Sequence, residues 1–136
     1  HTENLPLIEG NKSQLQQLFT NLIGNSLKYS QAGKAPVINI LGRKKEDGYW
    51  EINVEDNGIG FDEKYTELIF QPFQRLHGKS KYEGSGIGLS ICKKIVDHHK
   101  GTLSVTSKPG EGTTFTITLP AQQPLAVVAH LPNQKP

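Results

Sequence analysis

The chain has 136 residues, which is the size of one globular domain with its own hydrophobic core. Its 15 lysine and arginine residues nearly balance its 13 aspartate and glutamate residues, and the net charge of +2 argues against a protein that binds nucleic acid or a membrane surface. A single cysteine excludes a disulfide framework and a metal site with several thiolate ligands, and the apolar runs are too short for a membrane span or a signal peptide, so we expect a cytoplasmic domain.

The first predicted elements are a short strand and a long helix. Residues 5–8 read Leu-Pro-Leu-Ile, and because proline has no N–H for a strand ladder, we expect a short edge strand there. Asn11, followed three residues later by Gln14, predicts a helix start with a side-chain N-cap. Apolar residues then recur at helical spacing: Leu15, Leu18, Phe19, Leu22 and Ile23. We expect this helix to fade near residues 29–30 and to end by Gly33.

Alternating apolar residues predict two pairs of strands. Residues 37–41 and 50–55, separated by a Glu-Asp-Gly turn, predict a hairpin with one buried face. Residues 103–105 and 115–119, separated by a Pro-Gly-Glu-Gly turn, predict a second pair. Together with the helices, these strands indicate a fold of mixed α and β structure.

No long element is predicted within residues 57–86. We expect only a short helix at about residues 63–69, followed by a polar stretch from residue 71 to residue 85. A loop of this length in a small domain usually has a function.

A second helix follows this loop. Its apolar residues are Ile87, Leu89, Ile91, Cys92, Ile95 and Val96. Gly101 is the expected C-terminal stop, and we expect His98 and His99, near the helix end, to be surface residues. Residues 121–136 are rich in proline, which indicates a linker or an extended tail rather than part of the core.

Two glycine clusters are candidates for ligand binding. Gly58 and Gly60 follow a predicted strand, and Gly84, Gly86 and Gly88 precede the second helix. Glycine lets the backbone approach a ligand closely, and the free N–H groups of a helix N-terminus attract phosphate. Neither the Rossmann fingerprint nor the P-loop motif is present, so the second cluster is either a different phosphate cradle or a plain flexible turn.

Three polar residues share one face of the first helix, because Asn21, Asn25 and Lys28 have helical spacing. Asparagine oxygens are suitable ligands for Mg²⁺, and a lysine ammonium is suited to phosphate. The same face is also compatible with an ordinary solvated surface.

Asp56, Arg75 and Thr113 are candidates with equally ordinary alternatives. Asp56 ends a predicted strand, where its carboxylate can accept a hydrogen bond from the amino group of a base or can form an Asx turn. Arg75 lies in the polar stretch and could reach a phosphate or simply be a surface residue. Thr113 starts a strand, for which β propensity is a sufficient reason.

Taken in order, these groups resemble the motifs of the catalytic ATP-binding domain of bacterial sensor histidine kinases, in the superfamily that includes gyrase, the heat-shock chaperone ATPase and mismatch-repair ATPases. The similar segments are residues 21–30 (N box), 56–61 (G1 box), 70–75 (F box), 84–89 (G2 box) and 112–115 (closing threonine motif). They cover roughly residues 8–120. Residues 75–96 are especially similar to the kinases of phytochrome and PAS-linked receptors.

The resemblance implies the Bergerat ATP-binding fold, an α+β two-layer sandwich in which a mixed sheet carries helices on one face. The catalytic domain would occupy residues 1–120, and residues 121–136 would be a tail or linker. Because the chain begins with His1 rather than methionine, we expect it to be part of a longer kinase. The phosphoacceptor histidine would lie on a dimerisation domain outside this chain, and a response regulator would be the downstream partner.

The resemblance also implies the ligands ATP and Mg²⁺ and the residues that hold them. Asn25 would be the principal Mg²⁺ ligand, with Asn21 assisting. Lys28 would contact phosphate, and Tyr29 would lie near the base or ribose. Asp56 would accept the adenine amino group and so select ATP over GTP.

The remaining motifs receive roles on the same basis. Gly58 and Gly60 would let the chain pass close to the base, and Thr113 would support Asp56 and a bridging water. Residues 71–85 would form the ATP lid, with Arg75 near the γ-phosphate. The G2 box would place its residues at the phosphates: Gly84, Ser85, Gly86, Ile87, Gly88 and Leu89. Catalytic roles would fall to Asn21, Asn25, Lys28 and Arg75.

One position separates transfer from hydrolysis within the superfamily. Hydrolytic relatives carry a glutamate four residues before the Mg²⁺ asparagine, as the general base for water. Asn21 stands there in this chain, and an amide cannot act as a base, so we expect a histidine kinase with slow hydrolysis. Two alternatives stay open: a nucleotide-binding regulatory module without phosphotransfer, or an anti-sigma-type serine kinase of the same superfamily.

Overall fold

The structure is a computed structural model that describes residues 1–71 and 88–122. Its strands are β1 (Thr2–Glu3), β2 (Ile38–Lys44), β3 (Tyr49–Asp56), β4 (Thr102–Lys108) and β5 (Gly112–Pro120). Its helices are α1 (Lys12–Lys28), α2 (Gly88–His98) and the short 3₁₀ helices η1 (Glu46–Gly48), η2 (Glu63–Tyr65) and η3 (Leu68–Phe70). None of the helices in these two ranges is both long and apolar enough to span a bilayer.

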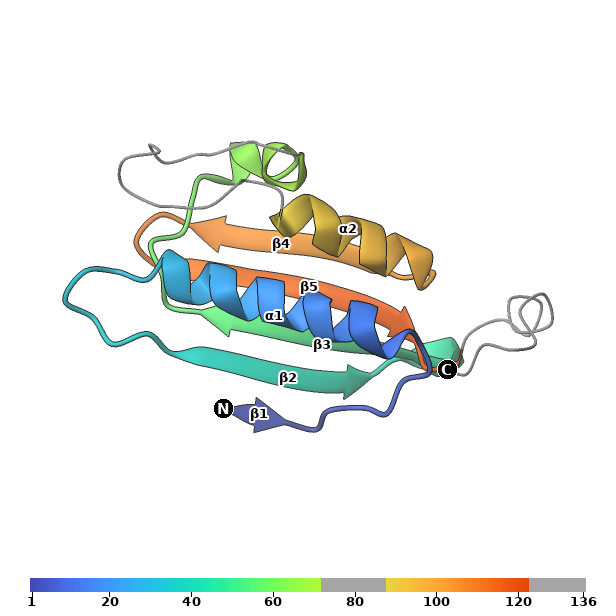
Figure 1. The fold of residues 1–136 in the computed structure, drawn as a ribbon. Coiled ribbons are helices and arrows are strands. Elements are labelled where there is room, and N and C mark those ends of the chain that lie inside the picture. The colour runs from blue at the N-terminus through green and yellow to red at the C-terminus, as the bar shows by residue number, and fades with distance from the viewer. Residues whose placement is uncertain (72–87, 123–136) are drawn as a thin grey trace.

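The strands form one mixed sheet. Within the described residues its order is β1-β2-β3-β5-β4, with β1 parallel to β2 and all other neighbouring pairs antiparallel. Helices α1 and α2 pack beside each other on one face of this sheet (Figure 1). This arrangement confirms the predicted α+β fold, because a sheet that buries one apolar face needs a single covering layer of helices.

The core lies between the sheet and these helices. Successive side chains of a strand point to opposite faces, so every second residue of β3, β4 and β5 faces α1 and α2. The side chains with no exposed surface come from both layers: Leu18, Leu22, Val54, Cys92, Val96, Phe115 and Ile117. Both predicted strand pairs are therefore confirmed, and buried residues alternate with more exposed ones along β3, β4 and β5.

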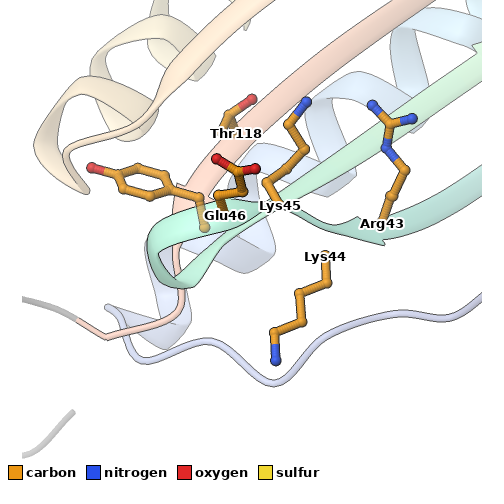
Figure 2. Close-up of a pocket in the computed structure, with 6 residues that line it drawn as sticks. Arg43, Lys44, Lys45, Glu46 and Thr118 are labelled. Carbon is orange, nitrogen blue, oxygen red and sulfur yellow. The ribbon is translucent and has the colours of Figure 1, made fainter.

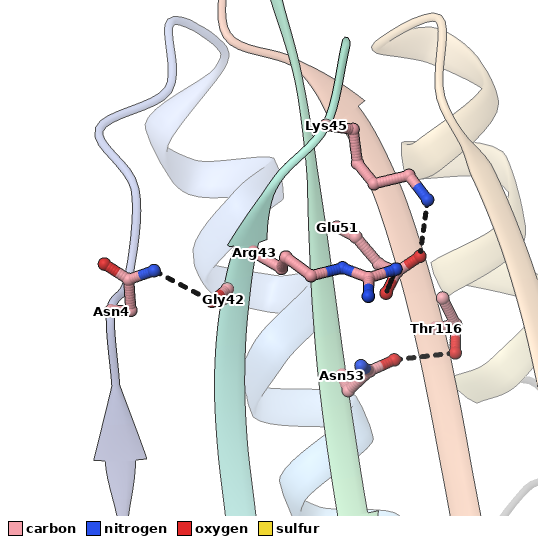
Figure 3. Close-up of polar contacts among 7 residues, drawn as sticks. All are labelled: Asn4, Gly42, Arg43, Lys45, Glu51, Asn53 and Thr116. Carbon is pink, nitrogen blue, oxygen red and sulfur yellow. Dashed lines mark hydrogen bonds and ion pairs between the residues drawn. The ribbon is translucent and has the colours of Figure 1, made fainter.

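The opposite face of the sheet is polar. Glu51 on β3 pairs with Arg43 at 3.2 Å and with Lys45 at 3.5 Å (Figure 3). Thr116 Oγ1 on β5 donates a hydrogen bond of 2.8 Å to Asn53 Oδ1 on β3. An antiparallel region with such a face can contact water without a second helical layer.

Helix α1 begins and ends as predicted. The Asn11 side chain accepts the N–H of Gln14 at 2.9 Å, which satisfies one of the free donors of the first turn. The helix ends at Lys28, and Tyr29 is the C-terminal cap residue.

The predicted edge strand at residues 5–8 is wrong, because the edge strand is β1, closer to the N-terminus. Asn4 ends that strand: its φ of 54° turns the chain out of the extended path. Its side-chain amide donates to the Gly42 carbonyl at 3.1 Å (Figure 3). A side chain at position 42 would overlap the Asn4 carbonyl, so Gly42 permits this crossing.

The end of α2 differs from the prediction at one position. The N–H of Gly101 donates to the Val96 carbonyl at 3.0 Å, and the N–H of Lys100 donates to the Asp97 carbonyl at 3.1 Å. These two hydrogen bonds form a Schellman motif. The left-handed residue of this motif is Lys100, with φ 64°, and not Gly101. Glycine is required at position 101 for a steric reason, because a side chain there would overlap the Thr118 carbonyl of β5.

His98 is exposed as predicted, but the prediction of a surface position for His99 is wrong, because His99 is only 2% exposed. Its Nε2 accepts the N–H of Asn11 at 3.0 Å, and its Nδ1 lies 2.8 Å from the Ile95 carbonyl oxygen. A backbone N–H can only donate and a carbonyl can only accept, so the proton is on Nδ1. The ring therefore joins the end of α2 to the start of α1.

The segment after β3 contains short helices where one was predicted at residues 63–69. These are η2 and η3, both single 3₁₀ turns. Phe70 ends η3 and packs edge-to-face against Phe115, with ring centroids 6.3 Å apart, so this segment is attached to the core. From residue 72 to residue 85 the predicted polar stretch lies outside the described residues.

The chain after β5 stays attached for at least one residue. The N–H of Ala121 donates to the Gly48 carbonyl at 2.8 Å, and its carbonyl accepts the N–H of Glu9 at the same distance. The predicted tail lies outside the described residues from residue 123 onward, so the domain limit at residue 120 stays a prediction.

Candidate functional site

Several predicted site residues come together at one end of the sheet: Tyr29, Asp56, Gly58 and Thr113. The end of α1, the end of β3 and the start of β5 meet there, at the left of Figure 1. Asp56, the last residue of β3, pairs in register with Thr113 of β5. Ser26, in the last turns of α1, reaches Asp56 from above the sheet.

Three donors hold the Asp56 carboxylate. Its Oδ2 accepts the Ser26 hydroxyl at 2.8 Å, and its Oδ1 accepts the N–H of Gly58 at 2.8 Å and the N–H of Thr113 at 3.2 Å. An ionised carboxylate offers about four lone-pair positions, so these contacts orient it and leave capacity for a further donor. Asp56 is therefore fixed as an acceptor at the end of the sheet.

Thr113 contacts Asp56 through its backbone, while its hydroxyl lies 2.8 Å from the Ser107 hydroxyl. Ser107 Oγ also accepts the N–H of Phe61 at 2.9 Å and lies 2.9 Å from the Gly112 carbonyl oxygen. This buried serine thus connects the loop after β3 to the turn between β4 and β5. Both segments flank Asp56, so Ser107 stabilises the surroundings of the carboxylate.

The predicted polar face of α1 is present beside this carboxylate. Asn21 and Asn25 are half-buried on it. Asn21 Nδ2 donates to the carbonyl of Gly88, the first residue of α2, at the long distance of 3.5 Å. An Asn21 hydrogen bond also acts on the Cys92 thiol. Asn21 therefore connects the two helices as well as facing the site.

The donors on α1 fit a magnesium ion. Among residues 1–71 and 88–122, no cluster of three His, Cys, Asp or Glu side chains could hold a metal. Mg²⁺ prefers hard oxygen donors and keeps waters and phosphate oxygens in its shell, so amide oxygens with a phosphate ligand are sufficient. Because Asn21 turns its nitrogen toward α2, its Oδ1 is the atom left for such an ion. Asn25 follows one helical turn later on the same face of α1.

Lys28 and Tyr29 lie at the end of α1. The Lys28 ammonium is 5.8 Å from the centroid of the Tyr29 ring, a cation–π contact. The Tyr29 carbonyl accepts the N–H of Ile59 at 2.9 Å, which ties the end of α1 to the loop after β3.

Gly58 and Gly60 allow close backbone packing in that loop. A side chain at position 58 would stand 2.6 Å from the Tyr29 carbonyl oxygen, and one at position 60 would overlap the Lys108 carbonyl. Gly60 also has φ 65°, which side chains disfavour. Both glycines thus have a structural reason in addition to the predicted approach to a base.

Three polar residues of this region were not predicted from the sequence: Ser26, Ser107 and Gln31. Gln31 Nε2 donates to the carbonyls of Asn57, Gly58 and Gly110. Single serines and glutamines carry no periodicity or motif, so no sequence signal distinguishes these three from solvated residues.

Several predicted residues lie outside the described residues: Arg75, Gly84, Ser85, Gly86 and Ile87. Gly88 and Leu89 are described and form the first turn of α2. Nothing in the described residues lies within 4 Å of where a Gly88 side chain would be, so this turn is open on that side.

A large surface hollow lies at the other end of the sheet. Its volume is about 830 Å³, and it is lined by Arg43, Lys44, Lys45, Glu46, Tyr49 and Thr118 (Figure 2). Glu51 already pairs with Arg43 and Lys45. None of the predicted site residues lines it, and the oriented carboxylate at Asp56 is the stronger evidence for a binding site.

Comparison with known proteins identifies the family. Residues 10–123 match the family described as histidine kinase-, DNA gyrase B- and HSP90-like ATPase. The chain is 45% identical over 117 residues to the phytochrome-like protein Cph1 of Synechocystis sp., a match that covers 86% of the chain. It spans only 15% of the length of that relative.

Solved structures agree with this assignment. The mycobacterial sensor histidine kinase MprB is 28% identical with a TM-score of 0.73, over 86% of the chain and 76% of that structure. The catalytic domain of the histidine kinase ThkA, in a nucleotide-free form, is 28% identical with a TM-score of 0.72, over 89% of the chain and 77% of that structure. The chain therefore belongs to the family of histidine kinase-, DNA gyrase B- and HSP90-like ATPases, and its fold is that of a histidine kinase catalytic domain.

Proposed function

We propose that this chain binds Mg²⁺-ATP at the Asp56 end of the sheet and is the catalytic domain of a sensor histidine kinase. The observation that carries the proposal is the Asp56 carboxylate, which three donors orient beside the polar face of α1. Membership of an ATPase family supports ATP as the ligand, and the histidine kinase relatives support phosphotransfer as the reaction.

The base of the nucleotide would lie against Asp56. The carboxylate accepts, and adenine presents an amino group where guanine presents a carbonyl oxygen, so the site would favour ATP over GTP. Tyr29, Gly58 and Gly60 would border the base, and the N–H of Thr113 keeps the carboxylate in place.

The phosphates would lie between α1 and the start of α2. Asn25 and Asn21 would supply oxygen ligands for Mg²⁺, and Lys28 would contact a phosphate. The bound ion would neutralise charge on the transferred phosphoryl group. The first turn of α2, with Gly88 and Leu89, would offer free N–H groups to the phosphates, together with the rest of the G2 box and Arg75.

The residue at position 21 supports transfer rather than hydrolysis. The side chain there is an amide, which cannot take a proton from water, so bound ATP would be preserved for a histidine acceptor. That histidine would lie on the dimerisation domain of the parent protein, and a response regulator would take the phosphoryl group from it. The catalytic unit would be residues 1–120, acting in the cytoplasm.

The metal site is tested by calorimetry with Asn25→Ala. Removing a residue that only supports a metal ligand typically lowers affinity by roughly 10–100-fold. Because Asn25→Ala would remove a direct ligand, we expect its affinity for ATP in the presence of Mg²⁺ to fall by more than this. Gln17→Ala, which changes an exposed amide on the same helix, is the matched control and should bind like the unmodified chain. Equal affinity of Asn25→Ala and Gln17→Ala would reject this site.

The reaction is tested by mixing the chain with a purified dimerisation domain and γ-labelled ATP. Label on the histidine of that domain supports the kinase. Tight Mg²⁺-ATP binding without label on the acceptor would instead favour the regulatory module, and label on a serine of a partner would favour the anti-sigma-type kinase.

A further inference from the structure

Gln31 is the side chain that connects the three segments around the proposed base pocket. It lies just after α1 and is half-buried. Its Nε2 donates to the carbonyls of Asn57 at 3.1 Å, Gly58 at 2.9 Å and Gly110 at 3.1 Å. The first two carbonyls belong to the loop after β3, and the third belongs to the turn between β4 and β5. One amide group thus bridges elements that lie up to 79 residues apart in the sequence.

The Asn57 carbonyl gives this contact a direct mechanical link to Asp56. The peptide group between residues 57 and 58 contains both the Asn57 carbonyl and the Gly58 N–H, and it is planar. Gln31 holds the carbonyl, and Asp56 Oδ1 accepts the N–H at 2.8 Å. The orientation of this one plane therefore determines where the N–H points, and the N–H in turn orients the Asp56 carboxylate.

Backbone hydrogen bonds fix the position of the same loop between its neighbours. The N–H of Ile59 donates to the Tyr29 carbonyl at 2.9 Å, and the N–H of Gly110 donates to the Ile59 carbonyl at 2.7 Å. These bonds keep the loop between its neighbours when Gln31 is changed. They do not act on the peptide between residues 57 and 58. Asn57 is also held by its own N–H, which donates to the Val37 carbonyl at 3.3 Å, and by its side chain, which accepts the N–H of Val37 at 2.9 Å. Gln31 adds the contact on the carbonyl of the Asn57–Gly58 peptide itself, so it contributes directly to the rotation of that peptide.

We propose that Gln31 is a positioning residue for recognition of the nucleotide base, acting through the Asn57–Gly58 peptide on the Asp56 carboxylate. This inference rests on the proposed function, because it needs ATP as the ligand. It adds a residue to base selection that lies outside the family motifs recognised in the sequence.

Gln31→Glu is the sharpest variant, because glutamate has the shape of glutamine but its ionised form has no hydrogen to donate. Its carboxylate oxygens would face three carbonyl oxygens. Gln31→Ala removes the donors without adding charge and serves as the second variant if Gln31→Glu fails to fold. Gln17→Glu makes the same chemical change at an exposed position of α1 and is the matched control.

Two readouts separate positioning from general destabilisation. Calorimetry should show ATP affinity reduced by about tenfold in both Gln31 variants, the size expected for one lost hydrogen bond to a charged or buried group, with GTP affinity reduced much less. Nuclear magnetic resonance should show faster hydrogen exchange at the Gly58 amide in the nucleotide-free variants. The control should match the unmodified chain in both measurements.

The outcomes distinguish this inference from the proposed function. If the unmodified chain binds no ATP, the proposed function fails. If it binds ATP and both Gln31 variants keep its affinity and its preference over GTP, the inference is overturned and the proposed function stands. Equal losses for ATP and GTP, with unchanged exchange at Gly58, would also overturn it, because they would show a structural role alone.

Discussion

Asp56 uses its two carboxylate oxygens in different directions. Oδ2 faces Ser26 on α1, and Oδ1 faces the backbone of the loop after β3 and of β5. All three groups donate, so the carboxylate is held as an acceptor, and a further partner must be a hydrogen-bond donor or a cation. An amino group meets that requirement, whereas a carbonyl oxygen does not.

Cys92 should behave as an inert core residue. It has no exposed surface, and burial raises the pKa of its thiol to about 12, against which a hydrogen bond from Asn21 acts weakly. Since the thiolate is the reactive form, we expect Ellman's reagent to label the native chain far more slowly than the urea-unfolded chain at pH 8. Complete labelling of the native chain within the mixing time would contradict this burial.

The same pKa predicts a loss of stability at high pH. Above about pH 8.5 the unfolded chain releases the thiol proton, whereas the folded chain keeps it up to about pH 12, so the free energy of unfolding falls as the pH rises through that interval. The slope contributed by one full proton is about 1.4 kcal/mol per pH unit. Urea unfolding between pH 9 and pH 10.5 should show a shallower slope for Cys92→Ala than for the unmodified chain.

At the scale of elements, α2 is joined to α1 at both of its own ends. Asn21 reaches the first residue of α2, and His99 after α2 accepts the N–H of Asn11 before α1. Gly10 is part of this second junction, because a side chain there would stand 2.7 Å from the His99 ring. The start of α2 is also the proposed phosphate-binding turn, so the junctions hold the two helices that would face the nucleotide.

His99 should therefore matter far more than its neighbour. His99→Ala leaves a cavity and removes the acceptor of the Asn11 N–H, so we expect a loss of about 2–4 kcal/mol in the free energy of unfolding. His98→Ala, at the exposed position next to it, should change stability by less than about 0.5 kcal/mol. Urea unfolding monitored by circular dichroism compares them, and coincident midpoints would show that the His99 junction contributes nothing.

At the scale of the whole molecule, the sheet separates two environments. One face is covered by α1 and α2 and is apolar, and the other carries charge pairs and hydroxyl groups. The strand alternation that produces this division also places Asp56 and Thr113 on the helix-covered side, at the end of the sheet. The proposed site is thus the rim of the core, where polar side chains meet the edge of the apolar layer.

The two faces should respond differently to truncation. Phe115 on β5 has no exposed surface and contacts Phe70, so we expect Phe115→Ala to cost about 3–5 kcal/mol. Ser104 on β4 points away from the helices and is exposed, so Ser104→Ala should stay within about 0.5 kcal/mol. Thermal unfolding by calorimetry measures both, and a similar loss for both variants would contradict the assignment of the two faces.

Much of the fold could be predicted because its signals are local. The spacing of Leu18 and Leu22, the cap at Asn11 and the alternation in β3 and β5 depend on neighbours within one element. Two of the failures have local causes as well, whereas the burial of His99 depends on its distant contact with Asn11. Asn4 adopts a left-handed conformation that ends β1 before the predicted strand, and Lys100 takes the left-handed position expected of Gly101.

The sequence by itself determined the helices, the strand pairs and the types of residue that face the candidate site. Only the tertiary structure decided which donors meet which acceptors. Ser26 and Asp56 are 30 residues apart, Gln31 and Gly110 are 79 apart, and Asn11 and His99 are 88 apart. A hydrogen bond requires a particular distance and direction between two atoms, and for such distant residues these exist only once the whole chain has packed.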